Sequence, residues 1–337
     1  MDTAKPLVIV IVGATGSGKS DLGIRVAREV GGEVICADSR TVYRGMDIGT
    51  AKPTIIFPPL SASAGGGEVR RGGVSAESYQ DAPPPPHEYI ERGREIKHHL
   101  LDIRNPNEPY SVAEFQQDAD ACIRAIVEHG KVPIVVGGTM LYVRALVDWL
   151  NFARTAARPE RRQELERMDV SALQQFLLEL DPDAADVVDV ANKRRLIRAI
   201  ETVESVGVPL ARARGTGEAP YRFLQIGLSV ERDVLRERIA QRTHAMFADG
   251  LLDEVQRIRD TYGDSIEPLR GVVYRQCMEW VMHPSDDRVS QEELEQRINR
   301  ELNRYARRQL AWFRKDARVR WVQDAGEAIA LVKENVQ

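Results

Sequence analysis

The segment from Gly13 to Ser20 constrains the fold of this chain most strongly, because it reads Gly-Ala-Thr-Gly-Ser-Gly-Lys-Ser directly after the apolar run Leu7–Val12. This is the G-x-x-x-x-G-K-[ST] pattern of a phosphate-binding loop between a strand and a helix. Glycine lets the backbone bend around an anion, so that N–H groups and the helix N-terminus converge on a diphosphate. The predicted diphosphate-binding residues are Gly13, Ala14, Thr15, Gly16, Ser17, Gly18, Lys19 and Ser20. Lys19 would add a positive charge, and Ser20 a hydroxyl ligand for Mg²⁺.

Length and composition set broad limits. The chain has 337 residues, 43% of them hydrophobic, which is enough for one α/β domain and a further element. No apolar run reaches the roughly 20 residues of a membrane helix, and the first residues lack a signal-peptide pattern. We therefore expect a cytoplasmic protein without membrane contact. Cys36, Cys122 and Cys277 have no partners at metal-binding spacing, so buried free thiols are expected.

Strand and helix patterns alternate through residues 1–150. The expected strands are Leu7–Val12, Glu33–Ala37, His99–Ile103 and Val132–Val136, and the expected helices are Lys19–Val30, Ser111–His129 and Thr139–Trp149. This alternation is typical of a doubly wound parallel sheet. A Pro/Gly-rich segment at about 54–97 interrupts it and is expected to be a mobile surface insertion.

The remaining chain is mainly helical. Residues 151–210 show helical patterns without strand alternation, which indicates a helical insertion domain. Residues 211–337 begin with a returning strand at Tyr221–Val230 and end near a short strand at Arg320–Val322. Between them, helices are expected at Glu231–Ala248, Leu251–Thr261 and, rich in arginine, at Glu292–Lys315. The predicted fold is therefore α/β: a P-loop NTPase-like doubly wound parallel sheet with a helical insertion domain and a helical C-terminal region.

Two further loops are expected beside the phosphate loop, because ligands of open α/β sheets lie at the carboxyl ends of the strands. Asp38 follows the second strand and could hold Mg²⁺ through water, accept a proton, or merely cap a turn. The other loop contains Gly137, Gly138 and Thr139, where backbone could approach a ligand closely. ATP-hydrolysing P-loop enzymes usually have an acidic residue there, so this loop argues against γ-phosphate chemistry.

Basic residues cluster locally although the net charge is −4. Helical spacing places Arg194 and Arg198 on one face, while nine Arg or Lys residues lie between Arg297 and Arg320. Such clusters can follow a phosphate backbone, but a solvated helix face is an equally ordinary explanation.

Together these residues resemble the tRNA dimethylallyltransferase family, also called tRNA isopentenyltransferase. The resemblance covers most of the chain outside the Pro/Gly-rich segment. It depends on the phosphate loop and on the segments Gly45–Pro53, His98–Asp102, Gly137–Tyr142 and Arg307–Phe313. The run Gly-Met-Asp-Ile-Gly-Thr-Ala-Lys-Pro at 45–53 is the most specific of these.

The resemblance implies transfer of a dimethylallyl group from dimethylallyl diphosphate to the exocyclic amine of the adenosine 3′ of a tRNA anticodon, with Mg²⁺. By position, Asp38 would be the general base, and Lys19 and Thr139 would also be catalytic. Residues 151–210 would grip the tRNA anticodon arm, and a monomer is expected. The residues that would contact tRNA are Asp38, Ser39, Arg40, Thr41, Thr139, Arg194, Arg195, Leu196, Ile197, Arg198, Arg270, Tyr274, Arg275 and Gln276.

Three features depart from the family pattern. Thr41 stands where the family usually has Gln, the 54–97 segment is long, and the helical insertion is short. Two other functions stay open. A P-loop small-molecule kinase would share the phosphate loop and the parallel sheet and would turn over ATP. A non-catalytic tRNA-binding relative, suggested by Thr41 and the long segment, would bind tRNA without forming product.

Overall fold

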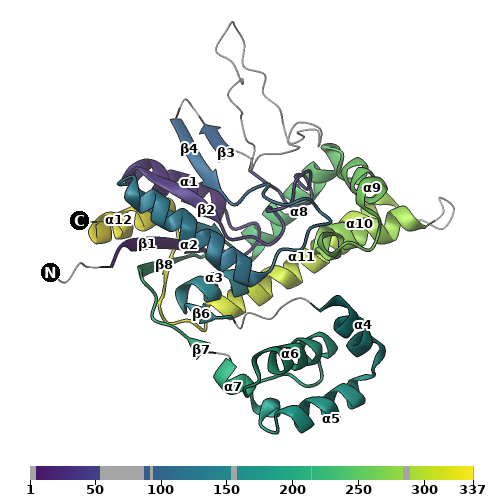
Figure 1. Ribbon diagram of the computed structural model, residues 1–337. Helices are drawn as coiled ribbons and strands as arrows, with labels where there is room; N and C mark the ends of the chain where they lie inside the picture. The colour runs from purple at the N-terminus through teal and green to yellow at the C-terminus, as the bar shows by residue number, and fades with distance from the viewer. Residues whose placement is uncertain are drawn as a thin grey trace, which may run out of the picture. The chain divides into compact units, whose positions relative to one another are not determined.

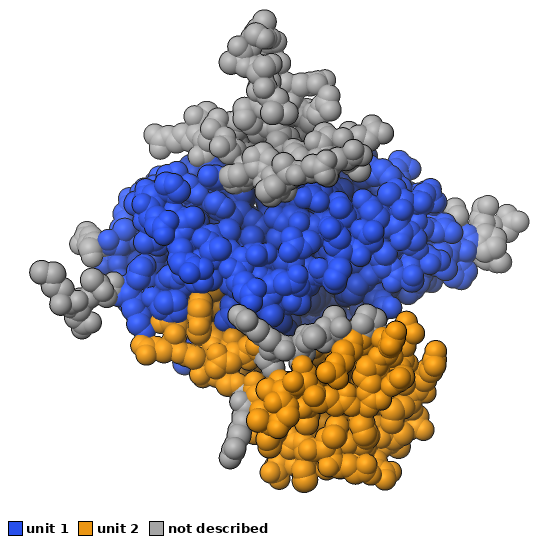
Figure 2. Space-filling view, in the orientation of Figure 1, with its two compact units in different colours: residues 1–143, 220–337 blue, residues 144–219 orange. Residues whose placement is uncertain are grey.

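A computed structural model of the chain describes residues 5–53, 87–91, 94–152, 158–213, 215–283 and 289–336. The chain divides into two compact units, one formed by Met1–Val143 with Pro220–Gln337 and the other by Arg144–Ala219 (blue and orange in Figure 2). Most of the predicted Pro/Gly-rich insertion, residues 54–86, lies outside the described residues.

The first unit is built on a central sheet (Figure 1). Within the described residues it has seven strands in the order β3-β4-β2-β5-β1-β8-β9. Their bounds are β1 Leu7–Val12, β2 Gly32–Cys36, β3 His87–Glu91, β4 Arg94–His99, β5 Val132–Gly137, β8 Arg222–Leu228 and β9 Val319–Val322. Every neighbouring pair is parallel except β3 with β4. The predicted doubly wound, mostly parallel sheet is thus confirmed.

Helices cover both faces of this sheet (Figure 1). On one face, α1 (Lys19–Val30) and α12 (Ala325–Val336) pack against the alternate strand residues Ile9 and Ile11. On the other face lie α2 (Val112–Glu128) and α3 (Met140–Val147), joined by the stacked rings of Phe115 and Tyr142. A strand buried on both faces needs a continuous apolar sequence, which explains the run at β1.

The strand predicted at His99–Ile103 is wrong. Strand β4 ends at His99, and the chain then turns through Leu100 and Asp102, whose φ angles are 62° and 53°. The Asp102 N–H donates to the Thr41 carbonyl at 3.2 Å, so this stretch pairs with the loop after β2 and not with the sheet. The apolar pattern identified burial correctly, since Leu101 is in the core, but burial does not require an extended backbone.

A second core in this unit is helical. It is formed by α8 (Arg232–Ala248), α9 (Leu251–Tyr262), α10 (Val272–Met282) and α11 (Gln291–Phe313). The sequence predicted α8, α9 and α11 but not α10 or α12. Val42, Tyr43 and Met46 are buried in the same core, so the loop after β2 is anchored in the C-terminal helices.

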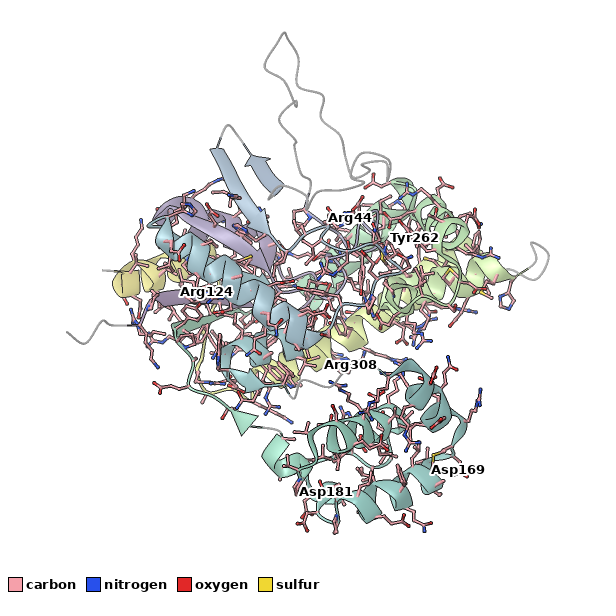
Figure 3. All side chains as sticks on the ribbon, viewed as in Figure 1. Arg44, Arg124, Asp169, Asp181, Tyr262 and Arg308 are labelled. Atoms are coloured by element: carbon pink, nitrogen blue, oxygen red, sulfur yellow. The ribbon has the colours of Figure 1, made fainter. Side chains whose placement is uncertain are left out.

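The second unit is helical around its own core. Its helices are α4 (Pro159–Arg167), α5 (Val170–Leu180), η2 (Ala184–Asp186), α6 (Lys193–Val206) and α7 (Leu210–Ala213). Two short strands, β6 (Leu150–Asn151) and β7 (Gly215–Thr216), form an antiparallel pair. Two aspartates hold the ends of α5 (Figure 3). Asp169 accepts the Ala172 N–H at 2.8 Å, and buried Asp181 accepts the Leu210 N–H at 2.7 Å. Among the described residues of both units, no helix has the length and apolarity needed to cross a membrane.

Gly137 provides a test of the sheet, because a Cβ at this position would overlap the Ala37 carbonyl oxygen where β5 meets β2. We expect Gly137→Ala to lower the free energy of unfolding by about 2–3 kcal/mol, since backbone cannot yield as a flexible side chain can. The control is Gly215→Ala, whose Cβ would make an ordinary 3.5 Å contact with Asn151 Nδ2. Equal urea midpoints for the two variants would contradict this account.

Candidate active site

The phosphate loop has the geometry that its sequence predicts. Gly16 and Gly18 have φ angles of 80° and 93°, a region that favours glycine. Gly18 is the N-cap of α1, and the Lys19 ammonium folds back to donate to the Ala14 carbonyl at 3.3 Å. Free N–H groups at the start of α1 therefore face the same space as a lysine charge, which suits an anion.

The loops after β2 and β5 meet beside the phosphate loop, as predicted for the carboxyl ends of parallel strands. The Ser39 N–H donates to Thr139 Oγ1 at 3.0 Å, and the Thr139 N–H donates to the Ala37 carbonyl at 3.3 Å. Asp38 is half-buried, and its Oδ1 accepts the Arg40 N–H at 2.9 Å. Thr139 thus joins the two loops, and the Asp38 carboxylate is held by a turn within its own loop.

Gly137, the last residue of β5, and Gly138 also make close contacts within the protein. A Cβ at Gly137 would overlap the Ala37 carbonyl, and a Cβ at Gly138 would overlap the side-chain nitrogen of Gln309. The pair is therefore needed for close contact with the protein's own groups. Gln309, on α11, donates to the Gly138 carbonyl at 2.8 Å and accepts the Thr15 N–H at 2.8 Å.

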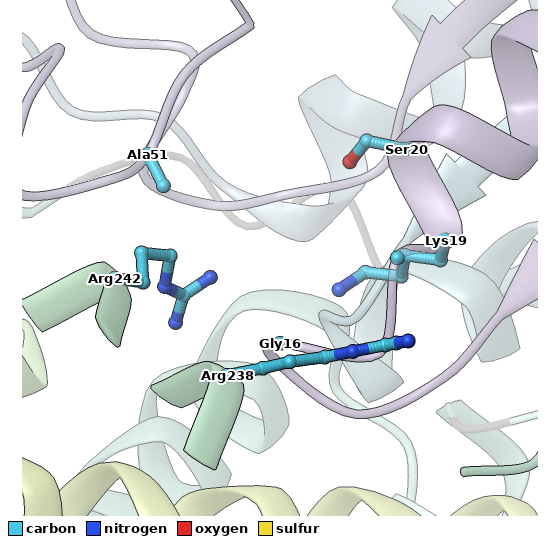
Figure 4. Close-up of a pocket in the computed structure, with 7 residues that line it drawn as sticks. Gly16, Lys19, Ser20, Ala51, Arg238 and Arg242 are labelled. Carbon is cyan, nitrogen blue, oxygen red and sulfur yellow. The ribbon is translucent and has the colours of Figure 1, made fainter. Parts of the chain in front are cut away.

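Two arginines that were not predicted from the sequence complete the phosphate site. They line a cavity of about 300 Å³ together with Gly16, Gly18, Lys19, Ser20 and Ala51 (Figure 4). Arg242 donates to Thr15 Oγ1 at 2.6 Å, and Arg238 donates to the Ser17 carbonyl at 3.1 Å. The two arginines lie four residues apart on α8, the helix after β8, so they share one helix face. That spacing was the only sequence signal for them, and it does not connect them to the phosphate loop.

Two of the cationic groups that line this cavity are buried at a cost in solvation. Burial lowers the pKa of the Lys19 ammonium to about 8, with Asp38 opposing the shift and Arg242 adding to it. Burial also lowers the pKa of the Arg242 guanidinium, whose Nε has no hydrogen-bond partner among the described residues. A bound anion would relieve these desolvated cations, so the cavity favours a multiply charged anionic ligand.

A second cavity of about 90 Å³ shares Lys19, Ser20, Ala51 and Arg242 with the first. Its other lining residues are Thr15, Val34, Cys36, Asp38, Thr41, Thr50, Pro53, His98, Leu101, Val136 and Gly137. Its lining therefore combines phosphate-loop residues with Asp38 and with the apolar side chains of Val34, Leu101 and Val136. The Thr41 hydroxyl is buried without a hydrogen-bond partner in the described part of the chain.

A metal would find few protein ligands here. The described residues contain no group of three His, Cys, Asp or Glu side chains that could hold an ion. The three cysteines are free; Cys36 and Cys277 are buried as expected, but Cys122 is half-buried. Ser20 and Asp38 both line the second cavity, and such a sparse set suits Mg²⁺, which keeps several waters and binds phosphate oxygens.

Besides Thr41, three of the predicted tRNA-contacting residues are buried. Leu196 and Ile197 lie in the core of the second unit, and Tyr274 is 1% exposed with its hydroxyl donating to Glu254 at 2.7 Å. Their side chains are therefore structural, because α6 and α10 each turn an apolar face inward. Direct side-chain contact with RNA is not open to them.

The predicted basic residues are accessible. Arg194, Arg195 and Arg198 are exposed on α6, as are Arg270 and Arg275 near the start of α10, and Gln276 is half-buried. In the first unit α11 also exposes arginines, among them Arg308 (Figure 3), whose guanidinium lies 5.8 Å from the Tyr305 ring centre. Arg40 is less free, because it pairs with Glu267 at 2.6 Å.

The role of Arg242 can be tested by binding of inorganic diphosphate. We expect Arg242→Ala to raise the Kd about 10- to 100-fold, the usual loss for a hydrogen bond to a charged group. Arg236→Ala is the matched control, since Arg236 lies on the same helix, is half exposed and pairs with Asp233 at 3.7 Å. Calorimetric titration of both variants measures the Kd of diphosphate. Equal losses of affinity in the two variants would mean that only the net charge of the protein matters, and not the position of Arg242.

The lowered pKa of Lys19 predicts a pH dependence. Lys19 is charged below pH 8 and loses its charge as the pH rises through about 8, so diphosphate binding should weaken above that value. The expected slope is about tenfold in Kd per pH unit, because one proton is taken up on binding. Lys19→Arg keeps its charge throughout, so its profile should contain only the titration of diphosphate itself. If the wild type and Lys19→Arg have superimposable pH profiles, the titration of Lys19 does not govern diphosphate binding.

Comparisons with known proteins show what this chain is similar to. The sequence model of the IPP transferase family matches residues 83–316. A tRNA dimethylallyltransferase 1 from Pelobacter propionicus is 37% identical over 95% of this chain and 93% of its own length. The solved full-length tRNA isopentenylpyrophosphate transferase from Bacillus halodurans has 33% identity and a TM-score of 0.63, covering 98% of this chain and 95% of its own.

A eukaryotic dimethylallyltransferase, solved acting on tRNA, shares the fold with a TM-score of 0.72 and 23% identity over 98% of this chain and 79% of its own. The family model covers more than half of the chain, and the bacterial relatives match nearly all of it. This chain therefore belongs to the IPP transferase family.

Proposed function

We propose that this protein transfers a dimethylallyl group from dimethylallyl diphosphate to the exocyclic amine of the adenosine 3′ of a tRNA anticodon, releasing diphosphate. The names of its relatives support this reading. The observation that carries it is the pair of cavities that share Lys19, Ser20, Ala51 and Arg242: one is lined by the phosphate loop and two arginines, the other also by Asp38 and by apolar side chains. Apolar side chains beside a diphosphate site suit a hydrocarbon group.

The phosphate loop would serve the leaving group. As the bond between the dimethylallyl carbon and the diphosphate oxygen breaks, negative charge accumulates on the diphosphate. Lys19, Arg238 and Arg242 face this position and would stabilise the developing charge in a partly desolvated cavity. The apolar side chains Val34 and Val136 would accommodate the five-carbon chain beside it.

Mg²⁺ would be held by the Ser20 hydroxyl, waters and the diphosphate, and it supplies further positive charge to the leaving group. Ser20 lines both cavities, so its hydroxyl is available to such an ion. The nearby lysine and arginines favour binding of the diphosphate with or without the ion.

Asp38 would act on the acceptor. The adenine amine forms its new bond to the dimethylallyl carbon while the carbon–oxygen bond breaks, and the amine gains positive character. Asp38, the carboxylate in the second cavity, would take the proton that the amine then loses. The target base must leave its stack to reach the site. Ser39, Arg40 and Thr41 would line it, and Thr139 would hold their loop.

Exposed arginines would bind the tRNA backbone. Arg194, Arg195 and Arg198 lie on the second unit, which we assign to the anticodon arm, and Arg270, Arg275 and Gln276 lie on the first. Recognition would depend mainly on loop shape and phosphates. One chain carries every proposed site residue, so we propose that it acts as a monomer, in the cytoplasm with its tRNA substrate.

Asp38 provides the test of the mechanism. We expect Asp38→Asn to lower kcat for transfer of labelled dimethylallyl to unmodified tRNA about 10²- to 10⁴-fold, because the amide cannot accept the proton. The KM of the donor should change little. The control is Asp233→Asn, which removes a carboxylate that is 93% exposed. ATP consumption, measured in parallel, would reveal a kinase, and tRNA binding without label would reveal a non-catalytic relative.

A further inference from the structure

Residues 45–53, here called the 45–53 loop, form the sequence run that is most specific to the family, but they have no role in the mechanism above. The loop nevertheless forms part of the site, because Thr50, Ala51 and Pro53 line the second cavity and Ala51 also lines the first. Ala51 has a φ of 51°, a conformation that a non-glycine residue adopts only when its surroundings impose it. Something must therefore hold this loop against the phosphate loop.

The carboxylate of Glu254, on α9, fixes the position of the 45–53 loop. It accepts three successive backbone N–H groups of the loop, from Asp47 at 2.9 Å, Ile48 at 2.8 Å and Gly49 at 3.0 Å. The Tyr274 hydroxyl on α10 donates to the same carboxylate at 2.7 Å. The Glu254 residue is only 2% exposed, so these four donors replace its water.

The loop also packs on the ring of Tyr274. A Cβ at Gly49 would lie 2.6 Å from the Cζ atom of that ring, so only glycine fits between the loop backbone and α10. A second tie lies at the end of the loop. The buried Lys52 ammonium donates to the Tyr43 carbonyl at 2.8 Å, to Asp47 at 2.6 Å and to Asp102.

We propose that Glu254, supported by Tyr274, is a positioning residue that fixes the 45–53 loop as a wall of the diphosphate and donor cavity. This inference rests on the proposed function, since it concerns the same site. Neither side chain lines either of these two cavities, so both act through the loop. A wall held in place before binding spares the ligand the entropy of ordering it, and this lowers the Kd.

Glu254→Gln keeps the size of the side chain but turns one acceptor into a donor. The new NH₂ group must then face at least one loop N–H group, whichever way the amide is turned. We expect the Kd of inorganic diphosphate and the KM of dimethylallyl diphosphate to rise roughly tenfold. The KM of tRNA and the kcat at saturating donor should change less than about twofold, because Asp38 and the exposed arginines are untouched.

Two variants complete the experiment. Asp260→Asn removes a carboxylate from an exposed position of the same helix and should leave the Kd of diphosphate unchanged. Tyr274→Phe keeps the ring against Gly49 but removes one donor to Glu254, and it should raise the Kd by a smaller factor. If Glu254→Gln does not fold, Tyr274→Phe carries the comparison.

A merely structural role for Glu254 would lower the melting temperature and the active fraction without changing the Kd of diphosphate, and that result would overturn the proposal. So would a Kd equal to that of the wild type in Tyr274→Phe when Glu254→Gln is unfolded. Failure of the proposed function is a different result: the wild type would transfer no label to tRNA, while the Kd of diphosphate would still respond to Glu254.

Discussion

The side chain of Gln309 joins the two loops on which the candidate site depends. It accepts the Thr15 N–H of the phosphate loop and donates to the Gly138 carbonyl after β5, while remaining 2% exposed. A buried amide with both ends satisfied strongly resists displacement, because any shift would leave a polar group unpaired. Since Gln309 belongs to α11, the C-terminal helices are part of the phosphate site and not an appendage to it.

The same helices determine the chemistry that the site favours. Helix α8 adds Arg238 and Arg242 to Lys19, and α9 and α10 hold the loop that closes the cavity. The strand β5 ends in glycine, where ATP-hydrolysing P-loop enzymes usually have a magnesium-binding carboxylate, and this is consistent with the proposed role of the site in binding a diphosphate leaving group. Asp38 lines the second cavity together with Lys19, Arg242 and the apolar side chains of Val34 and Val136. The cavity thus brings a carboxylate, cationic groups and apolar surface together.

Local patterns predicted much of this structure. The phosphate loop, the β1, β2, β5 and β8 strands and the helices α1, α2, α8, α9 and α11 follow from apolar periodicity and glycine punctuation. Long-range contacts were beyond that reasoning. Arg242 bonds to Thr15 across 227 positions and Gln309 across 294, so no local spacing connects them. The Leu100–Asp102 turn was misread because burial and not extension explains its apolar residues. Tyr274 was assigned to tRNA from its neighbours, although its ring faces the core.

The most direct test of the central claim uses the wild-type chain with labelled dimethylallyl diphosphate, Mg²⁺ and unmodified tRNA, followed by digestion and nucleoside analysis. The account predicts label on the exocyclic nitrogen of the adenosine 3′ of the anticodon, with one diphosphate released for each group transferred. Diphosphate released without labelled nucleoside, or ATP consumed with no label in the tRNA, would contradict it.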